Sequence, residues 1–210
     1  MNNITGQTGF VELLYGVLFS PKAAFRRIVD ENLLFQGFII FVVITLLTSL
    51  INFLGIRNFS GIPSEFISSF SQAGPYLGII AVVFAFISWL LKAGILQLFA
   101  ELLGGQGRAV EVLTVLALAG TPKVFVIPFQ VLGFFLAGSF AASFLSVAVS
   151  LSVSVWSLVL VVIGLRETQK LSGGRAVAAV ALPLGVLGLA FIIVAVSLVG
   201  FTAPYFTSIM

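Results

Sequence analysis

Five long apolar stretches fill most of this sequence, and the charged side chains fall almost entirely in the gaps between them. A helix needs about 20 apolar residues to cross the hydrocarbon core of a bilayer. Charged residues make up 8% of the chain, whereas an average soluble domain has about 25%. The pattern predicts an all-α fold, a polytopic integral membrane helical bundle whose five transmembrane helices cover residues 33–54, 76–100, 112–135, 142–165 and 176–201.

Turns between these spans follow from length and from proline. The third and fourth spans come from one uncharged run, residues 124–165. As a single helix it would be about 60 Å long, about twice the hydrocarbon thickness. We therefore predict a turn at residues 136–139, and we predict that the fifth helix ends at Thr202-Ala203-Pro204. The segment Pro63–Ala73 is predicted to be either a helix on the membrane surface or an ordinary loop.

The basic residues predict the orientation of the protein in the membrane. Alternate gaps, beginning with the segment before the first span, hold seven basic residues, while the other gaps hold only Arg57. Because basic loops stay on the cytoplasmic side, we predict a cytoplasmic N-terminus and a C-terminus outside. The seven residues predicted to lie inside are Lys22, Arg26, Arg27, Arg108, Arg166, Lys170 and Arg175.

Residues 1–32 are predicted to form a cytoplasmic N-terminal segment, and residues 33–210 the membrane domain. Ser20 and Pro21 are typical of a helix start. The helix that follows is amphipathic, with an apolar face made of Ala24, Phe25, Ile28 and Val29. Three cations on its other faces are predicted to contact lipid headgroups: Lys22, Arg26 and Arg27. The apolar segment Phe10–Phe19 is too short to span, so we expect it to lie on the membrane or to dock under the bundle.

Two lysines interrupt the predicted spans, Lys92 in the second and Lys123 in the third. A cation at the bilayer centre costs at least a few kcal/mol, so each should point inward or find a partner. Gln130 shares a helix face with Lys123. One interpretation is an internal polar or anion site, made of Lys123, Lys92 and Gln130, that holds a lipid phosphate or a small acidic solute. The other is structural, with the lysines reaching the interface or bonding a kinked backbone.

Three charged residues near the loop between the second and third spans are candidate partners for these lysines: Glu101, Arg108 and Glu111. The pairs we consider are Lys92 with Glu101, and Lys123 with an acid or a helix carbonyl on another span. Pro122 also frees a backbone carbonyl one turn earlier, which can accept a hydrogen bond from the Lys123 ammonium.

Several classes of function are excluded by what the sequence lacks. It has no Cys and no His, so thiolate nucleophiles, imidazole bases and the common zinc and haem ligand sets are absent. No Asp lies in a span, which excludes an intramembrane aspartyl pair. The segment Gly104-Gly105-Gln106-Gly107 lacks the GK[ST] ending of a phosphate-binding loop and is predicted to be a tight turn. We expect no enzyme activity, no cofactor and no metal.

Four features together resemble a known family. They are the segment 18–28, LFSPKAAFRRI, before the first span; Leu103-Gly104-Gly105-Gln106-Gly107 before the third; the small-residue run Ala117–Pro122; and Trp156 followed by Gly164-Leu165-Arg166-Glu167 and Arg175-Ala176. Their order along the chain is similar to that of the Yip (Ypt-interacting protein) domain membrane proteins, in their short prokaryotic form. The resemblance implies a five-span bundle with a cytosolic N-terminus.

In eukaryotic members, the resemblance implies interaction with prenylated Rab-type GTPases. That role is not expected here, because about 32 residues precede the first span. The family's Asp-Leu-Tyr-Gly-Pro motif is also reduced to Leu14-Tyr15-Gly16-Val17.

These observations predict a non-enzymatic membrane protein that organises the bilayer or docks a membrane or protein partner. The alternative is a small transporter or channel for an anionic or lipidic solute that uses the intramembrane lysines. The expected location is the cytoplasmic (inner) membrane of a prokaryote. Membrane lipids are the expected partners, together with a second copy or another membrane protein, because serines step along one face of residues 143–157. Nucleic acid is not expected, because the basic patches lie at lipid headgroups.

Overall fold

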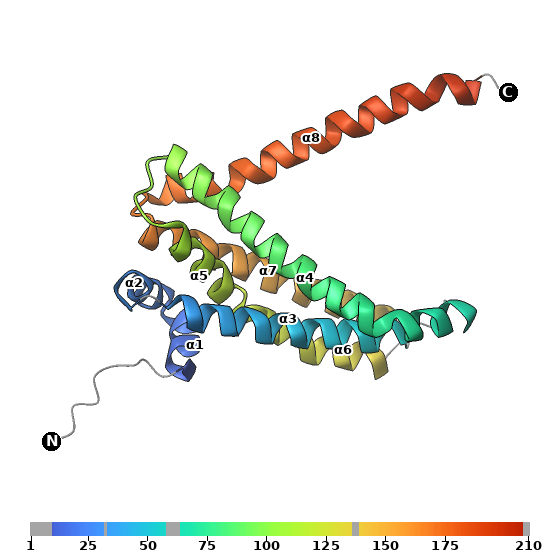
Figure 1. Ribbon diagram of the computed structural model, residues 1–210, viewed down its shortest axis with the longest axis horizontal. Helices are drawn as coiled ribbons and strands as arrows, with labels where there is room; N and C mark the ends of the chain where they lie inside the picture. The colour runs from blue at the N-terminus through green and yellow to red at the C-terminus, as the bar shows by residue number, and fades with distance from the viewer. Residues whose placement is uncertain (1–9, 32, 58–63, 136–138, 208–210) are drawn as a thin grey trace.

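The computed structural model describes residues 10–31, 33–57, 64–135 and 139–207, and within these ranges the chain forms helices and no strands (Figure 1). Five helical segments are long and apolar enough to cross a membrane, which confirms the predicted all-α, multi-pass bundle. The elements are α1 Phe10–Phe19, α2 Pro21–Glu31, α3 Leu34–Arg57, α4 Ser64–Leu102, α5 Ala109–Ala119, η1 Thr121–Phe125, α6 Val126–Phe135, α7 Phe140–Thr168 and α8 Gly173–Thr207.

The five segments that are apolar enough to cross a membrane begin and end within a few residues of the predicted spans, although some of the helices that contain them are longer. They are α3, α4, the broken helix α5–η1–α6, α7 and α8. The predicted turn at 136–139 falls mostly on residues outside the described ranges, and α6 ends at Phe135 before it while α7 begins at Phe140 after it. Hydropathy places these spans well because hydrocarbon demands a minimum length of apolar helix.

Two helices are longer than predicted. The segment Pro63–Ala73 is not a separate surface helix, because α4 runs unbroken from Ser64 to Leu102 through Pro75. The fifth helix does not end at Thr202-Ala203-Pro204, since α8 continues to Thr207. A proline removes one backbone donor, whereas unwinding a helix in an apolar environment leaves several backbone groups without partners. That difference explains why both helices pass through a proline.

The third span is broken by a short 3-10 helix, η1, at Pro122. A regular helix would pair the nitrogen of residue 122 with the carbonyl of Leu118, four residues earlier. Proline cannot make this bond, and the hydroxyl of Thr121 donates to the Leu118 carbonyl instead, at 2.6 Å. The carbonyl freed by Pro122 therefore has a donor other than the Lys123 ammonium.

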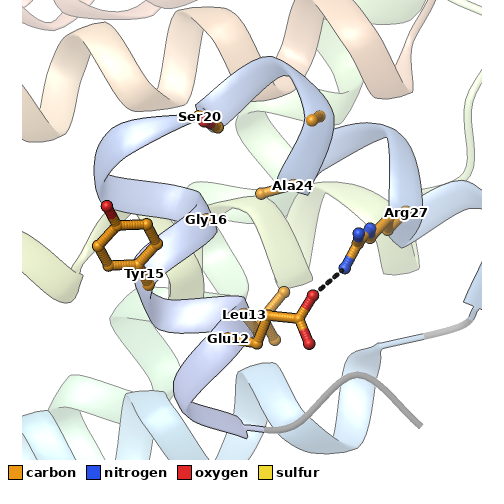
Figure 2. Close-up of a pocket in the computed structure, with 8 residues that line it drawn as sticks. Glu12, Leu13, Tyr15, Gly16, Ser20, Ala24 and Arg27 are labelled. Atoms are coloured by element: carbon orange, nitrogen blue, oxygen red, sulfur yellow. Dashed lines mark hydrogen bonds and ion pairs between the residues drawn. The ribbon is translucent and has the colours of Figure 1, made fainter. Parts of the chain in front are cut away.

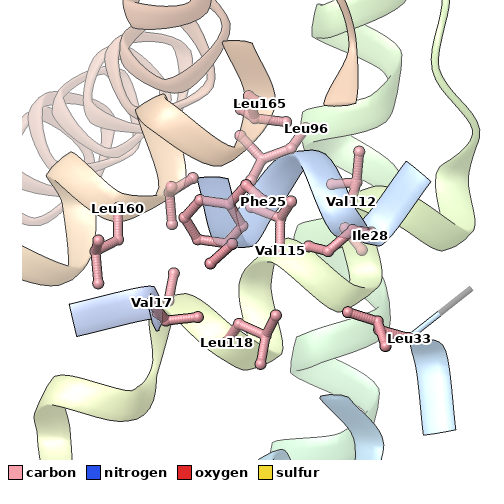
Figure 3. Close-up of a cluster of buried hydrophobic side chains, with 14 of the residues drawn as sticks. Val17, Phe25, Ile28, Leu33, Leu96, Val112, Val115, Leu118, Leu160 and Leu165 are labelled. Carbon is pink, nitrogen blue, oxygen red and sulfur yellow. The ribbon is translucent and has the colours of Figure 1, made fainter. Parts of the chain in front are cut away.

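The N-terminal helices share the core of the bundle (Figure 3). Phe25 of α2 is fully buried, beside Val115 of α5 and Leu160 of α7. Leu13 and Val17 of α1 are buried in the same cluster. The segment Phe10–Phe19 thus docks against the bundle, and the apolar face of α2 packs on protein.

Helix α8 packs on α4 and α7 only near its start. Ala176, Ala179 and Pro183 are buried, whereas almost every described side chain from Leu184 to Leu198 is exposed. Figure 1 shows α8 leaning away from the other spans over the rest of its length. At the packed end, α5 and α7 approach closely, since a side chain on Gly164 would overlap Val115.

Candidate functional site

Two buried glutamines join three parts of the chain at the end of the bundle where α4, α5 and α7 meet. Gln169, which follows α7, is fully buried, and its Nε2 donates to Oε1 of Gln97 on α4 at 3.0 Å. Its Oε1 accepts from the backbone nitrogen of Gly107 at 3.0 Å. Nε2 of Gln97 in turn donates to the Gly107 carbonyl at 3.1 Å. We call this arrangement of Gln97, Gly107 and Gln169 the glutamine bridge.

The Gly104–Gly107 segment forms the tight turn predicted between α4 and α5. Gly104 has φ +88°, which favours glycine. The nitrogen of Gly105 donates to the Ala100 carbonyl at 2.8 Å, which closes the end of α4. The nitrogen of Gln106 donates to the Gln169 carbonyl at 3.1 Å. The turn is thus pinned to the end of α7 by its backbone, and those backbone donors already have partners within the protein.

Glu101, Arg108 and Glu111, the candidate partners for the lysines, have other contacts in the structure. Glu101 accepts a hydrogen bond from Nε2 of Gln97 at 2.6 Å. Nε of Arg108 lies 3.5 Å from Oε1 of Glu111. The Arg108 backbone nitrogen donates to Oε2 of Glu111 at 3.1 Å, which satisfies a free donor at the start of α5.

Ion pairs also hold α1 and α2 in place. Nε of Arg26 donates to Oε2 of Glu167 on α7 at 2.8 Å. This hydrogen bond, and then the charge of Glu167, raises the pKa of Arg26 above its ordinary value, so Arg26 stays charged. Nη1 of Arg27 lies 3.4 Å from Oε1 of Glu12, at the edge of a cavity of about 170 Å³ between α1 and α2 (Figure 2).

The cations at this end are exposed, while two of its acids lie behind them. The side chain of Glu111 is 8% exposed and that of its partner Arg108 is 70% exposed. Glu167 is 9% exposed beneath Arg26, which is 71% exposed. The surface therefore shows more positive than negative charge. We call it the basic end, and its exposed cations are Lys22, Arg26, Arg27, Arg108, Arg166, Lys170 and Arg175.

The candidate intramembrane residues lie deeper along the spans. Lys92 is exposed on α4 and Lys123 is exposed on η1, and each lies within a membrane-crossing segment. Among the described residues no ion pair joins either lysine to an acid. Gln130 is half-buried on α6.

A comparison with protein families identifies this architecture. The model of the Yip1 domain matches residues 15–195, which run from α1 into α8. The chain belongs to the Yip1 domain family. The matched region begins inside α1 and includes α2, the glutamine bridge and the basic end, and the resemblance noted in the sequence is confirmed. Yip1 domain proteins are generally non-enzymatic membrane proteins. Neither the search of the curated proteins nor that of the solved structures gave a match.

Sequence reasoning missed the two glutamines of the bridge. A signal was present, because Gln97 is an uncharged polar residue inside an otherwise apolar span, and such residues usually bond across helices. Gln169 gave no such signal, since it follows the fourth span in a polar gap. Its burial depends on the Gly-rich turn folding over it.

Replacing Gln169 with leucine should destabilise the protein by about 2–4 kcal/mol, because buried polar groups without a partner cost about 1–3 kcal/mol each. The Gly107 nitrogen and the Gln97 amide oxygen would both lose their hydrogen-bond partner. Unfolding in detergent measures the change. Gln106→Leu is the matched control, since Gln106 is exposed and bonds Gln169 through its backbone only. Equal effects of the two variants would contradict a role for the bridge.

Proposed function

We propose that this Yip1 domain protein is a non-enzymatic membrane protein that organises anionic lipid, or docks an acidic partner, at its basic end. The observation that carries the proposal is the separation of charge at this surface. Arginines cover the acids Glu111 and Glu167, so the exposed charge is mainly positive. A basic residue near an anionic membrane surface contributes about 1 kcal/mol to binding.

The burial of the apolar face of α2 supports contact through charge and not through insertion. A helix that lies in the interface buries its apolar face among acyl chains. Here Ala24, Phe25 and Ile28 are buried in the protein core. Lys22, Arg26 and Arg27 remain exposed and can meet headgroups, although Arg26 and Arg27 also pair with Glu167 and Glu12. Such contact should weaken steeply with salt, because exposed charges are screened.

The orientation and location belong to the same proposal. With the basic end in the cytoplasm, the distribution of Lys and Arg follows the positive-inside rule. The anionic surface would then be the inner leaflet of a prokaryotic cytoplasmic membrane. Cysteine-scanning accessibility tests this: a single cysteine at exposed Ser172 should be labelled only after the membrane is opened.

Removing two exposed cations should weaken the preference for anionic lipid by about 1 kcal/mol per charge. Lys22 and Lys170 are suitable because neither belongs to an ion pair of the described residues. The measurement is retention of phosphatidylglycerol against phosphatidylcholine by the purified protein, at low and high salt. The double variant Lys22→Gln, Lys170→Gln should lose part of the preference, and Lys22→Arg, Lys170→Arg should keep it. An equal retention of both lipids, independent of salt, would refute the proposal for lipid.

A transporter or channel for an anionic solute is the second candidate, and the pair of intramembrane lysines favours it. Two cations in spanning segments, without an acidic partner among the described residues, would attract an anion. Anion flux into liposomes should then fall for Lys123→Met and for Lys92→Met, while Lys123→Arg keeps the charge and the flux. Flux no greater than that of empty vesicles would exclude this candidate and leave the first proposal standing.

A further inference from the structure

An apolar pocket of about 250 Å³ lies between α1, α3 and η1, away from the glutamine bridge. Its wall includes Leu14 and Leu18 of α1, Val43 and Ile44 of α3, and Val124 of η1. Thr121 is the one lining residue with a polar side chain, and its hydroxyl already donates to the Leu118 carbonyl. The pocket therefore offers no polar group to a ligand and selects an apolar one.

Two features of the fold create this pocket. Helix α1 buries Leu13 and Val17 in the core, which leaves Leu14 and Leu18 only half-buried beside α3. The third span changes from α-helix to the 3-10 helix η1 at Pro122, which interrupts the regular spacing of its side chains. Val124, which lies in η1, completes the wall of the pocket. The pocket is thus a result of docking a short helix against a broken span.

The mouth of the pocket opens on the outer surface of the bundle. Val43 is 45% exposed, Val124 is 40% exposed and Phe125 is 45% exposed. Because α3 and η1 belong to membrane-crossing segments, the medium outside this mouth is hydrocarbon. A lipid tail can therefore enter directly from the bilayer.

Helix α1 carries two exposed aromatic side chains. Tyr15 and Phe19 lie on it with ring centroids 4.6 Å apart. An exposed tyrosine is typical of the boundary between hydrocarbon and water. With α1 at that boundary, the pocket would run from the headgroup level at α1 toward η1, which is the direction of an acyl chain.

We infer that this pocket binds an acyl chain of an anionic bilayer phospholipid. Charge complementarity selects the anionic class, because Lys123 is exposed in the same 3-10 turn as Thr121, Val124 and Phe125. Its four-carbon stem lets the ammonium reach toward the polar boundary and pair with a phosphate. The inference goes beyond the proposed function, since this site takes a lipid tail and the basic end takes headgroups.

Photocrosslinking in vesicles tests the site. The probe is phosphatidylglycerol with a diazirine in one acyl chain, and labelled peptides are mapped by mass spectrometry. Labels should concentrate on α1, α3 and η1. Val43→Trp should fill the mouth and reduce this labelling severalfold, and Leu14→Trp provides a second variant that fills the pocket from α1. Val83→Trp is the control, because Val83 is exposed on α4 and does not line the pocket.

Four results would overturn the inference. Uniform labelling of all exposed helices, unchanged by both pocket variants, would show ordinary contact with bulk lipid. Labelling of α1, α3 and η1 that appears only when the protein is diluted in the vesicles would assign the pocket to a second copy. Stronger labelling by a diazirine fatty acid than by the phospholipid would assign it to a free acid, and equal labelling by a phosphatidylcholine probe would remove the anionic class. The Lys22→Gln, Lys170→Gln variant, which lacks two cations of the basic end, should keep the pocket labelling. A failure of the function proposed for the basic end can therefore be told apart from a failure of the pocket to bind lipid.

Discussion

Replacing Phe25 with alanine should destabilise the protein by about 3–5 kcal/mol, the usual cost of truncating a fully buried phenylalanine. Phe25 is the largest wholly buried side chain of α2 and lies at the junction of α1, α5 and α7 (Figure 3). Because its ring joins the N-terminal helices to the spans, its loss should free α1 and α2 before the spans separate. Thermal unfolding in detergent measures the stability, and hydrogen exchange of α1 and α2 measures their release.

Val29→Ala is the matched control for Phe25→Ala. Val29 was predicted on the same apolar face, but the structure leaves it 42% exposed. The control should change stability little, and exchange in α1 and α2 should stay slow. Similar small effects of the two variants would mean that α2 is held by its ion pair with Glu167 and not by its apolar face.

Replacing Gly107 with alanine should cost about 3 kcal/mol or more, because overpacking and broken buried hydrogen bonds add together. A Cβ at this position would lie 2.5 Å from the carbonyl oxygen of Thr168 and 2.7 Å from Nε2 of Gln169. It would also lie 2.7 Å from Oε2 of Glu111. The backbone oxygen is fixed by α7, so the turn must move and the glutamine bridge must open.

Thermal stability and exchange of the Gln106 and Gly107 amides measure this opening, since both amides donate to Gln169. Gly174→Ala serves as the control, because a Cβ there meets no atom within 4 Å. A Gly107→Ala variant as stable as Gly174→Ala would show that the turn yields without loss. That outcome would remove the structural reason for glycine at position 107.

The sequence predicted well where the spans lie, and it predicted poorly whether each helix face packs on lipid or on another helix. Hydropathy measures whether a side chain prefers an apolar medium, and it does not distinguish a lipid tail from another helix. For that reason the end of α4 at Leu102 was predicted closely, while the departure of α8 from the bundle after Pro183 was not. The same limit applies to α2, whose amphipathic pattern did not show that its apolar face packs on α5 and α7.

Polar contacts were harder to predict because they depend on which ends come together. Arg108 and Glu111 pair three residues apart on one helix, a spacing visible in the sequence. The bond between Gln97 and Gln169 joins residues 72 positions apart, and it is the packing of both α4 and α7 on α5 that brings them together. The placement of Lys92, Lys123 and Gln130 in a shared site remains a prediction.

The departure of α8 gives the molecule different cross-sections at its two ends. Near the basic end α8 lies against α4 and α7, whereas Figure 1 shows it separating from them toward its C-terminus. Across a bilayer, α8 would therefore lie beside the other spans in the leaflet at the basic end and apart from them in the opposite leaflet. Lipid would fill the space between α8 and the other spans in that second leaflet only. Such an arrangement would take unequal area from the two leaflets, which is the asymmetry that a sensitivity to membrane curvature requires.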